Sequence, residues 1–326
     1  MAANLRDKVS RVHYSGSMEQ LSFDTLTFDH PAACRPARVA ATLHLPERAE
    51  APVPCMVLLT SSAGVQRHRE HYYAAALNEA GIAAAIVDSF GPRGVRRTVA
   101  DQALVSAAQM EGDAFALLAR LRGDRRIDPA RIGVMGVSKG GGAALATAIA
   151  VRQRWRGGFP HLFDLHVAIC PGATAQHRDP ATHDRPIFFM LAARDDYTPA
   201  PMAVEYAERM RAAGNRRVKV KIYGSAHHGW ESIGPVHDIR DAENWSCCRN
   251  WIEDDGRHFV VAAGRTMSEP EYQAWARRHC VTRGARAGGG TAELKRRATA
   301  DLLAFLAVHE FAPQWTNPAL PAKLPQ

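Results

Sequence analysis

The stretch RIGVMGVSKGGGAALATA, residues 131–148, decides the fold, because an apolar run meets a serine among glycines and then an alanine-rich segment. The spacing Gly136-x-Ser138-x-Gly140 is typical of a sharp turn from a buried strand into a helix, with the serine as nucleophile. Bulky neighbours would clash in so tight a turn, and glycines avoid that clash. Two other interpretations are an N-cap serine and a phosphate-binding loop. A phosphate loop places Ser or Thr after Gly-Lys, whereas here Ser138 precedes Lys139.

Eight short apolar segments predict the strands of one sheet, and the amphipathic segments between them predict helices. The first two segments alternate apolar and polar residues like an antiparallel edge pair, and the middle ones are almost continuously apolar, as buried parallel strands are. The predicted fold class is therefore α/β, with a mostly parallel eight-stranded sheet flanked by helices. The strands are expected at residues 21–28, 38–45, 55–60, 81–88, 131–136, 164–170, 186–192 and 218–224.

The helical segments and one irregular segment complete the predicted organisation. Thr198 before Pro199 is a helix start signal, because a hydroxyl can cap free amides and proline suits the first helical position. Residues 236–290 break the alternation and are rich in charge, Trp and Gly, so we expect an insertion before the last helix within a single domain, 1–326. Helices are expected at residues 70–80, 101–122, 139–152, 199–213 and 292–309.

Candidate partners for Ser138 follow two later strands. A serine hydroxyl needs a general base to become a good nucleophile, so an acid and a histidine are required. Asp195 and Asp196 follow one buried strand, and His227 and His228 follow the next. The order Ser, Asp, His suits this strand–turn–helix architecture, in which the carboxyl ends of parallel strands form the crevice. Each residue alone also fits an ordinary role, such as a helix cap or a loop histidine.

Four segments together resemble the dienelactone hydrolase family of the α/β-hydrolase fold, in a member whose nucleophile is serine. They are VDSFGPRGV at 87–95, RIDPARIGVMGVSKGG at 126–141, LAARDDYTP at 191–199 and YGSAHHGW at 223–230. In that family the acid stands four positions before a proline, and the histidine directly precedes Gly and an aromatic residue. The resemblance therefore implies Asp195 and His228 as catalytic partners of Ser138, with Asp196 and His227 as second choices.

The oxyanion hole is expected to use two backbone amides. The amide of Lys139 is free because Lys139 opens the predicted helix. The resemblance implies a second donor from the loop LLTSSAGV at 58–65, where Ser62 is the best match and Ser61 the next. The dienelactone hydrolases themselves carry cysteine as nucleophile and often His-Gly where this chain has Thr60 and Ser61. Serine as nucleophile favours an ordinary carboxylic ester over a dienelactone.

Several side chains near these motifs are candidates for the substrate pocket. We expect Phe90, Arg93 and Trp230 to line it, together with Trp245 and Trp251 of the insertion; core packing is the alternative for the aromatic residues. Arg93 meets an anionic part of the substrate or braces its own loop, and bracing is the favoured role. The side chain of Lys139 diverges from that of Ser138 at such a turn, so a Ser–Lys dyad is not expected.

Three functions fit these motifs. The first is a serine hydrolase that cleaves carboxylic esters of small-molecule substrates by a Ser–His–Asp triad through an acyl-enzyme intermediate. The second is a peptidase or amidase with the same triad, and the third is a catalytically silent binding module on a hydrolase scaffold. No cofactor and no metal site is expected.

Charge and hydropathy limit the partners and the location. The net charge of +8 comes from arginines spread along the chain, so nucleic acid is not an expected partner. Every apolar run is shorter than the roughly 18 residues of a membrane span, so no membrane partner is expected either. The start of the sequence lacks the pattern of a secretory signal, and a cytoplasmic location is the expectation. The sequence leaves formation of a homo-oligomer open.

The six cysteines do not form a disulfide framework in a chain of this length. Cys34, Cys55 and Cys170 lie in or beside apolar segments and are expected to be reduced. One bridge is compatible with the sequence, between Cys280 and either Cys247 or Cys248.

Overall fold

The computed structural model describes residues 16–30, 33–47, 52–155 and 160–312. Within these ranges the side chains of residues 26–30 and 33–35 are not described, so the expectation for the Cys34 thiol lies outside the described part of the chain.

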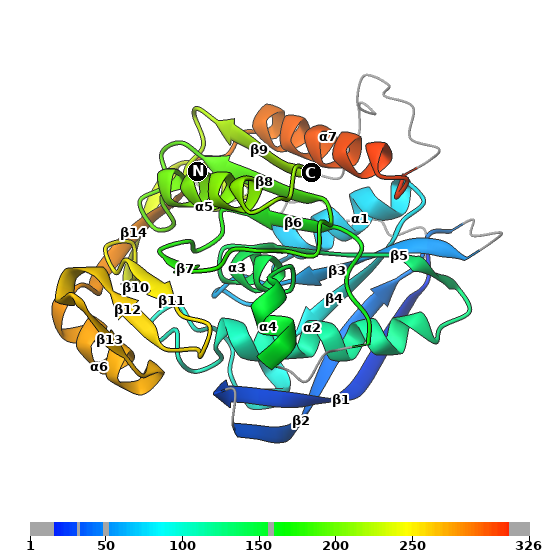
Figure 1. Ribbon diagram of the computed structural model, residues 1–326. Coiled ribbons are helices and arrows are strands. Elements are labelled where there is room, and N and C mark those ends of the chain that lie inside the picture. Colours follow the sequence, from blue (N-terminus) through cyan, green and yellow to red (C-terminus); the bar gives the residue numbers. More distant parts are fainter. Residues whose placement is uncertain (1–15, 31–32, 48–51, 156–159, 313–326) are drawn as a thin grey trace.

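An eight-stranded sheet forms the centre of the fold, as predicted (Figure 1). Its first two strands form an antiparallel hairpin, and the second joins the sheet antiparallel to β4; the other neighbours are parallel. In spatial order the strands are β1 (Met18–His30), β2 (Ala33–His44), β4 (Ala83–Asp88), β3 (Val53–Leu59), β5 (Ile127–Val137), β6 (His166–Ile169), β8 (Ile187–Ala192) and β9 (Val218–Tyr223).

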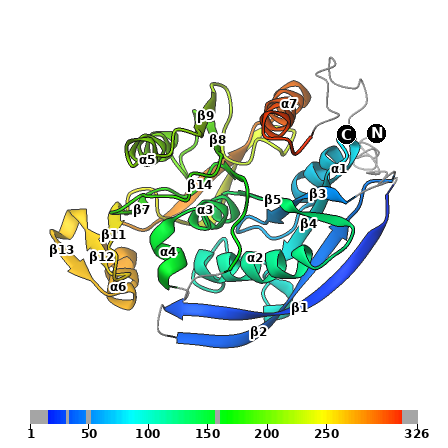
Figure 2. The same cartoon turned by 45° about the vertical axis from the view of Figure 1, so that its right-hand side comes forward.

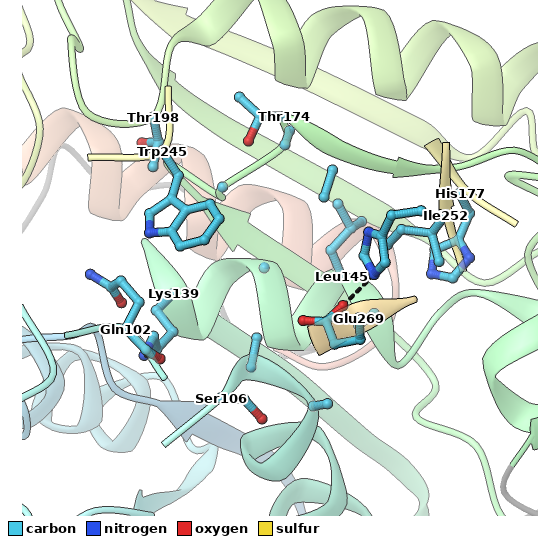
Figure 3. Close-up of a pocket in the computed structure, with 18 of the residues that line it drawn as sticks. Gln102, Ser106, Lys139, Leu145, Thr174, His177, Thr198, Trp245, Ile252 and Glu269 are labelled. Carbon is cyan, nitrogen blue, oxygen red and sulfur yellow. Dashed lines mark hydrogen bonds and ion pairs between the residues drawn. The ribbon is translucent and has the colours of Figure 1, made fainter. Parts of the chain in front are cut away.

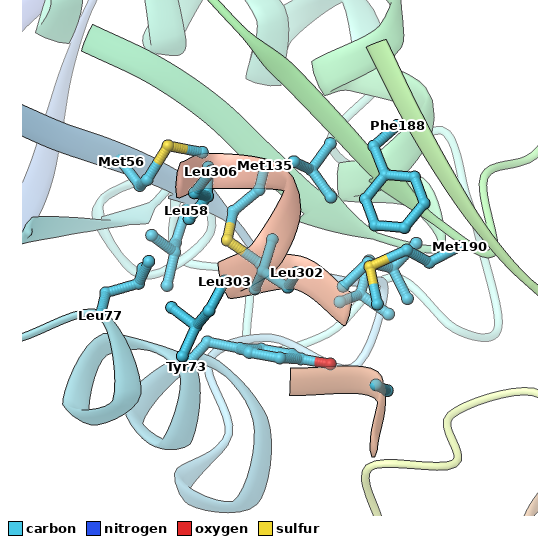
Figure 4. Close-up of a cluster of buried hydrophobic side chains, with 14 of the residues drawn as sticks. Met56, Leu58, Tyr73, Leu77, Met135, Phe188, Met190, Leu302, Leu303 and Leu306 are labelled. Atoms are coloured by element: carbon cyan, nitrogen blue, oxygen red, sulfur yellow. The ribbon is translucent and has the colours of Figure 1, made fainter. Parts of the chain in front are cut away.

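Helices cover both faces of the sheet because successive strand residues point to opposite sides. Phe188 and Met190 of β8 pack beneath α1 (Tyr72–Glu79) and α7 (Ala292–Val308), where Figure 4 shows the side chains interleaved. Phe189 and Leu191 point the other way, toward α4 (Ala150–Trp155) and α5 (Ala200–Ala212). The remaining helices of this second face are α2 (Ala107–Arg122) and α3 (Lys139–Ala146) (Figure 2).

The predicted helix bounds need three corrections. The segment 101–122 becomes helical only at Ala107, because the Ser106 hydroxyl and the Gln109 side chain form a capping box there. The segment 139–152 divides into α3 and α4, and the backbone bridge between Ile149 and Thr182 marks the interruption. A short π-helix, η1 (Arg67–His71), precedes α1, so helical backbone begins before the predicted start at residue 70.

The segment 236–290 forms a layer of its own at one end of the molecule (Figure 1). It is tied to the rest by parallel pairing of β11 with β7 (Ala175–His177), and β10 pairs with β14. Cys248 and Cys280 are disulfide-bonded, which selects Cys248 for the bridge, and Cys55 and Cys170 are free and buried, as expected. The elements of this layer are β10 (Val236–Asn244), β11 (Asn250–Ile252), β12 (His258–Val260), η3 (Val261–Ala263), β13 (Arg265–Met267), α6 (Glu269–His279) and β14 (Thr282–Gly288).

None of the helices in the described ranges combines the length and the apolar content needed to cross a bilayer.

The glycines around Ser138 yield a stability prediction. A Cβ on Gly140 would lie 2.5 Å from the Thr60 carbonyl oxygen and closer still to that of Leu59. Gly140→Ala should therefore lower the free energy of unfolding by about 1–3 kcal/mol. Gly142 is the matched control, since its Cβ would meet nothing closer than 3.6 Å, and Gly142→Ala should be neutral or stabilising by about 0.5–1 kcal/mol. Urea denaturation measures both, and equal effects would contradict the predicted packing.

Candidate active site

Ser138 lies in a strained turn between β5 and α3. Its φ of 57° and ψ of −117° are outside the regions that side-chain-bearing residues prefer, at a cost of about 1–3 kcal/mol. Two backbone hydrogen bonds hold the turn, from Ser138 N to the Ile169 carbonyl at 2.8 Å and from Gly142 N to the Ser138 carbonyl at 2.9 Å. A side chain on Gly136 would overlap the main chain of Gly140, so the motif's glycines are sterically required.

The loops after β8 and β9 bring Asp195 and His228 together. His228 Nδ1 lies 2.8 Å from Asp195 Oδ2, and both residues are buried. The other Asp195 oxygen accepts the backbone N–H groups of Tyr197 and Thr198 at 2.9 and 2.8 Å. The backbone N–H groups thus fix the carboxylate, whose Oδ2 atom binds the imidazole.

The two second-choice residues lie elsewhere. Asp196 forms an exposed ion pair with Arg286 at 2.7 Å, and the Nδ1 atom of His227 is buried without a hydrogen-bond partner among the described residues. Of the four candidates, only Asp195 and His228 form an acid–imidazole pair in the described part of the chain.

The contact between Asp195 and His228 shifts the pKa of both groups. Burial raises the pKa of Asp195, but the His228 charge and the hydrogen bonds to the carboxylate outweigh it, and the net pKa lies below its usual value. Burial lowers the pKa of His228, yet the Asp195 charge and hydrogen bond overcome that cost and raise the net pKa above 6.5. His228 is therefore a stronger base than an ordinary histidine.

A third side chain approaches this pair. The Cys170 thiol, buried at the end of β6, belongs with Asp195 and His228 to the one group of potential metal ligands found among the described residues, with ligand atoms within 4.8 Å of one another. Burial and the Asp195 charge raise the pKa of Cys170 well above its usual value, so the thiol stays protonated. Because the acid and the imidazole already bind each other, we interpret the group as an acid–base pair with a packed thiol.

Thr198 is a site residue that the sequence did not reveal. Its hydroxyl lies 2.9 Å from Asp195 Oδ2, 3.1 Å from His228 Nδ1 and 3.0 Å from the Cys170 carbonyl. The prediction that Thr198 caps a helix is wrong, since α5 begins at Ala200 and its N-cap, Pro199, has no side-chain cap bond. The hydroxyl instead ties the acid–imidazole pair to the end of β6.

One large cavity joins Ser138 to the surroundings of this pair. It has a volume of about 560 Å³, and its lining includes Ser138, Thr198 and Tyr197. The Tyr197 ring packs edge-on against the His228 ring with centroids 5.0 Å apart. Among the hydrogen bonds of the described residues, none joins the Ser138 hydroxyl to the imidazole. Such contacts are often long before substrate binds and shorten in the complex.

The predicted oxyanion loop also reaches the cavity. Ser62 lines it whereas Ser61 does not, because the Ser61 hydroxyl turns back to accept the Ala63 N–H at 3.1 Å. The carbonyl of Ser62 is fixed by the Thr98 N–H at 2.8 Å. The better of the two sequence matches thus lines the same cavity as Ser138.

Lys139 has separate roles for its backbone and its side chain. Its amide is the first of α3 and lacks a carbonyl partner within the helix. Its amine donates to Thr98 Oγ1 and to the carbonyls of Gln102 and Val105 at 2.7–2.8 Å, so it holds the loop before α2. Burial lowers the pKa of this amine to about 7, against the charges of Glu243 and Asp101. All three N–H donors are used on that loop.

The insertion supplies one wall of the cavity. Figure 3 shows Lys139 and Gln102 on one side, His177, Ile252 and Glu269 on the other, and Trp245 at the edge. The expectation that Trp245 borders the pocket therefore agrees with the structure. Trp251 does not line the cavity, because it packs among the guanidinium groups of neighbouring arginines, with Arg209 at 4.4 Å from its ring centre.

Three expected pocket residues are not in the cavity lining. Phe90 is buried in the core beside the β3–β5 region, and Trp230 is fully buried against Tyr223, with ring centroids 5.2 Å apart. Arg93 binds both oxygens of Asp113 at 2.7 and 2.8 Å and therefore braces its loop. The cavity is instead built by α2, α3, β7 and the insertion.

The sheet order, the strained turn at Ser138 and the crevice at the carboxyl ends of the strands define an α/β-hydrolase fold. The dienelactone hydrolase family model matches residues 39–254, and the chain belongs to that family, as the motif resemblance predicted. It is a hydrolase of that family.

Three solved structures are similar to this chain, and the first of them supports the fold. A thermophilic esterase of Thermogutta terrifontis is 13% identical with a TM-score of 0.52, and the match covers 93% of this chain and 95% of the esterase. A dienelactone hydrolase-like promiscuous phosphotriesterase from metagenomic libraries is 19% identical over 66% of this chain and 85% of its own, with a TM-score of 0.47. An esterase of Pyrococcus furiosus is 16% identical over the same shares, also with a TM-score of 0.47. No curated protein matches the chain.

The bracing role of Arg93 yields a second stability prediction. Arg93→Ala leaves the Asp113 carboxylate, which is fully buried, without its cation and should lower the free energy of unfolding by about 3–5 kcal/mol. Arg97 is the matched control, because its pair with Asp241 is about half exposed on both sides. Arg97→Ala should cost less than about 1 kcal/mol. Urea denaturation measures both variants, and a cost for Arg93→Ala as small as the control would contradict the brace.

Proposed function

We propose that this protein hydrolyses carboxylic esters, with Ser138 as nucleophile, His228 as general base and Asp195 as the acid that orients it. The observation that carries the proposal is the buried Asp195–His228 hydrogen bond of 2.8 Å at the rim where the strained Ser138 opens into a large cavity. Serine in place of the family's cysteine favours an ordinary ester as substrate.

The proposed reaction has two half-reactions. His228 Nε2 accepts the Ser138 proton as Oγ bonds to the ester carbonyl carbon, and the resulting oxyanion is bound by the amides of Lys139 and Ser62. Collapse of this intermediate breaks the bond to the alcohol, which leaves with the proton from His228. Water then attacks the acyl-enzyme by the same steps and releases the carboxylic acid.

Asp195 acts on this reaction through the imidazole. It fixes the tautomer in which Nδ1 carries hydrogen, and it stabilises the imidazolium that forms in each half-reaction. Thr198 supports the same geometry because its hydroxyl contacts both partners. We assign Thr198 a positioning role.

The nucleophile is tested by labelling and turnover. Wild-type protein should react with a fluorophosphonate probe at Ser138 and should hydrolyse p-nitrophenyl esters. Ser138→Ala should lose labelling and about 10⁶-fold in kcat, because the triad acts as a unit. Ser22→Ala, on an exposed strand position of β1, is the control and should behave as wild type. Labelling at another residue, or turnover that survives in Ser138→Ala, would refute the assignment.

The general base is tested by the pH dependence of kcat/KM. Only neutral His228 can accept the proton, and its pKa is raised, so kcat/KM should rise with pH through one ionisation whose midpoint lies above 6.5. Asp195→Asn removes the charge that raises the pKa of His228. The midpoint of the profile should therefore move to lower pH, and kcat should fall about 10⁴-fold. Rates are read at the isosbestic wavelength of p-nitrophenol. A midpoint that is the same in both proteins would exclude Asp195 as the partner.

A further inference from the structure

The cavity extends well beyond Ser138 along one face of α3. Gly142 and Ala146 follow Ser138 at intervals of four residues, and both line the cavity and are partly exposed. At a helical rise of about 1.5 Å per residue, the eight residues from Ser138 to Ala146 span about 12 Å. Their small side chains leave a corridor from the nucleophile, which Leu145 and Ile149 make apolar.

The far end of this corridor carries polar groups from both the core and the insertion. Arg152 pairs with the buried Glu111, and His258 pairs with Glu269, the contact dashed in Figure 3. Burial and the nearby Arg152 charge keep the pKa of His177 well below its usual range, so His177 is neutral. A neutral imidazole therefore lines this end of the cavity.

Two side chains at this end of the cavity can form a further hydrogen bond. Arg152 Nη1 lies 3.4 Å from His177 Nε2, and because arginine only donates, Nε2 accepts and Nδ1 carries the hydrogen. His177 is 4% exposed, and its Nδ1 atom has no partner among the described residues. The Glu269 side chain is 35% exposed and lines the cavity. Its two oxygens bind Gln273 and His258, and a carboxylate oxygen can accept a further hydrogen bond. A buried N–H donor without a partner and a partly exposed carboxylate in one cavity lining match a hydroxyl group, which accepts from one and donates to the other.

We infer that the enzyme's substrates are esters with one elongated apolar half that lies along α3 and ends in an uncharged hydroxyl group, bound by His177 and Glu269. This inference rests on the proposed esterase activity. A terminal carboxylate or ammonium is disfavoured, because it would lose its hydration at an end where the charged groups of Arg152 and Glu269 already bind partners. The insertion thus supplies a specificity subsite for the far end of the substrate.

The corridor is tested with ester substrates whose apolar half differs in length. Two substrate series are compared, p-nitrophenyl alkanoates from acetate to dodecanoate and alkyl acetates of the same lengths. In the series whose long half occupies the corridor, kcat/KM should rise about fourfold for each added methylene. Ala146→Trp should reduce the ratio of long-chain to acetate kcat/KM at least tenfold, and Ala146→Leu is the milder variant if tryptophan prevents folding. The exposed Ala212→Trp is the matched control and should keep the wild-type ratio. Equal ratios in all variants would overturn the corridor.

The polar end of the cavity is tested with an ω-hydroxy ester, in the chain length that gives the highest kcat/KM. It should exceed its ω-methyl counterpart about three- to tenfold in kcat/KM, as expected for one net hydrogen bond, and the ω-carboxy ester should be the poorest. His177→Gln removes the Nδ1 donor and should abolish the preference, whereas His177→Asn keeps an N–H at that position and should retain part of it. Absence of any preference in the wild type would overturn the subsite. Failure of the proposed function is a different result, namely no turnover of any ester and no probe labelling.

Discussion

The rest of the site depends on the backbone strain at Ser138. A residue with a side chain is held at positive φ because α3 packs so closely on β3 and β5 that only glycines fit at positions 136 and 140. The cost of this strain is met by the packing of the surrounding sheet, in which β3 and β5 pair in parallel from Cys55 and Ile132 to Leu59 and Gly136. The turn places the hydroxyl at the mouth of a cavity and leaves the first amides of α3 facing it.

The proposed reaction also requires a general base of suitable pKa at the carboxyl ends of the strands, where Ser138 lies. Asp195 and His228 come from loops after adjacent parallel strands, so the sheet itself sets their separation. Burial would weaken both charged forms, and the attraction between Asp195 and His228 offsets that cost, together with the hydrogen bonds from Tyr197 and Thr198 to the carboxylate. The proposed ester hydrolysis depends on this arrangement, and the insertion supplies one wall of the cavity that Ser138 lines.

The sequence predicted the eight strands and the motif residues, because apolar periodicity and the glycine spacing are local signals. It did not predict the pocket, whose walls depend on long-range contacts such as the pairing of β7 with β11. The Arg93 guanidinium pairs with the carboxylate of a residue on α2, twenty positions further along the chain. No local sequence pattern distinguishes such an ion pair from a contact with the substrate. Trp230 follows His228 by two residues, but Gly229 at φ 66° turns the chain so that the indole packs into the core.

The most direct test of the account is a crystal structure of the protein inhibited by a phosphonate ester. We expect a covalent bond to Ser138 Oγ, a phosphonyl oxygen about 2.7–3.1 Å from the amide nitrogens of Lys139 and Ser62, and His228 Nε2 within hydrogen-bond reach of Oγ. An adduct on another residue, or an imidazole that stays out of reach of Ser138 in the adduct, would contradict it.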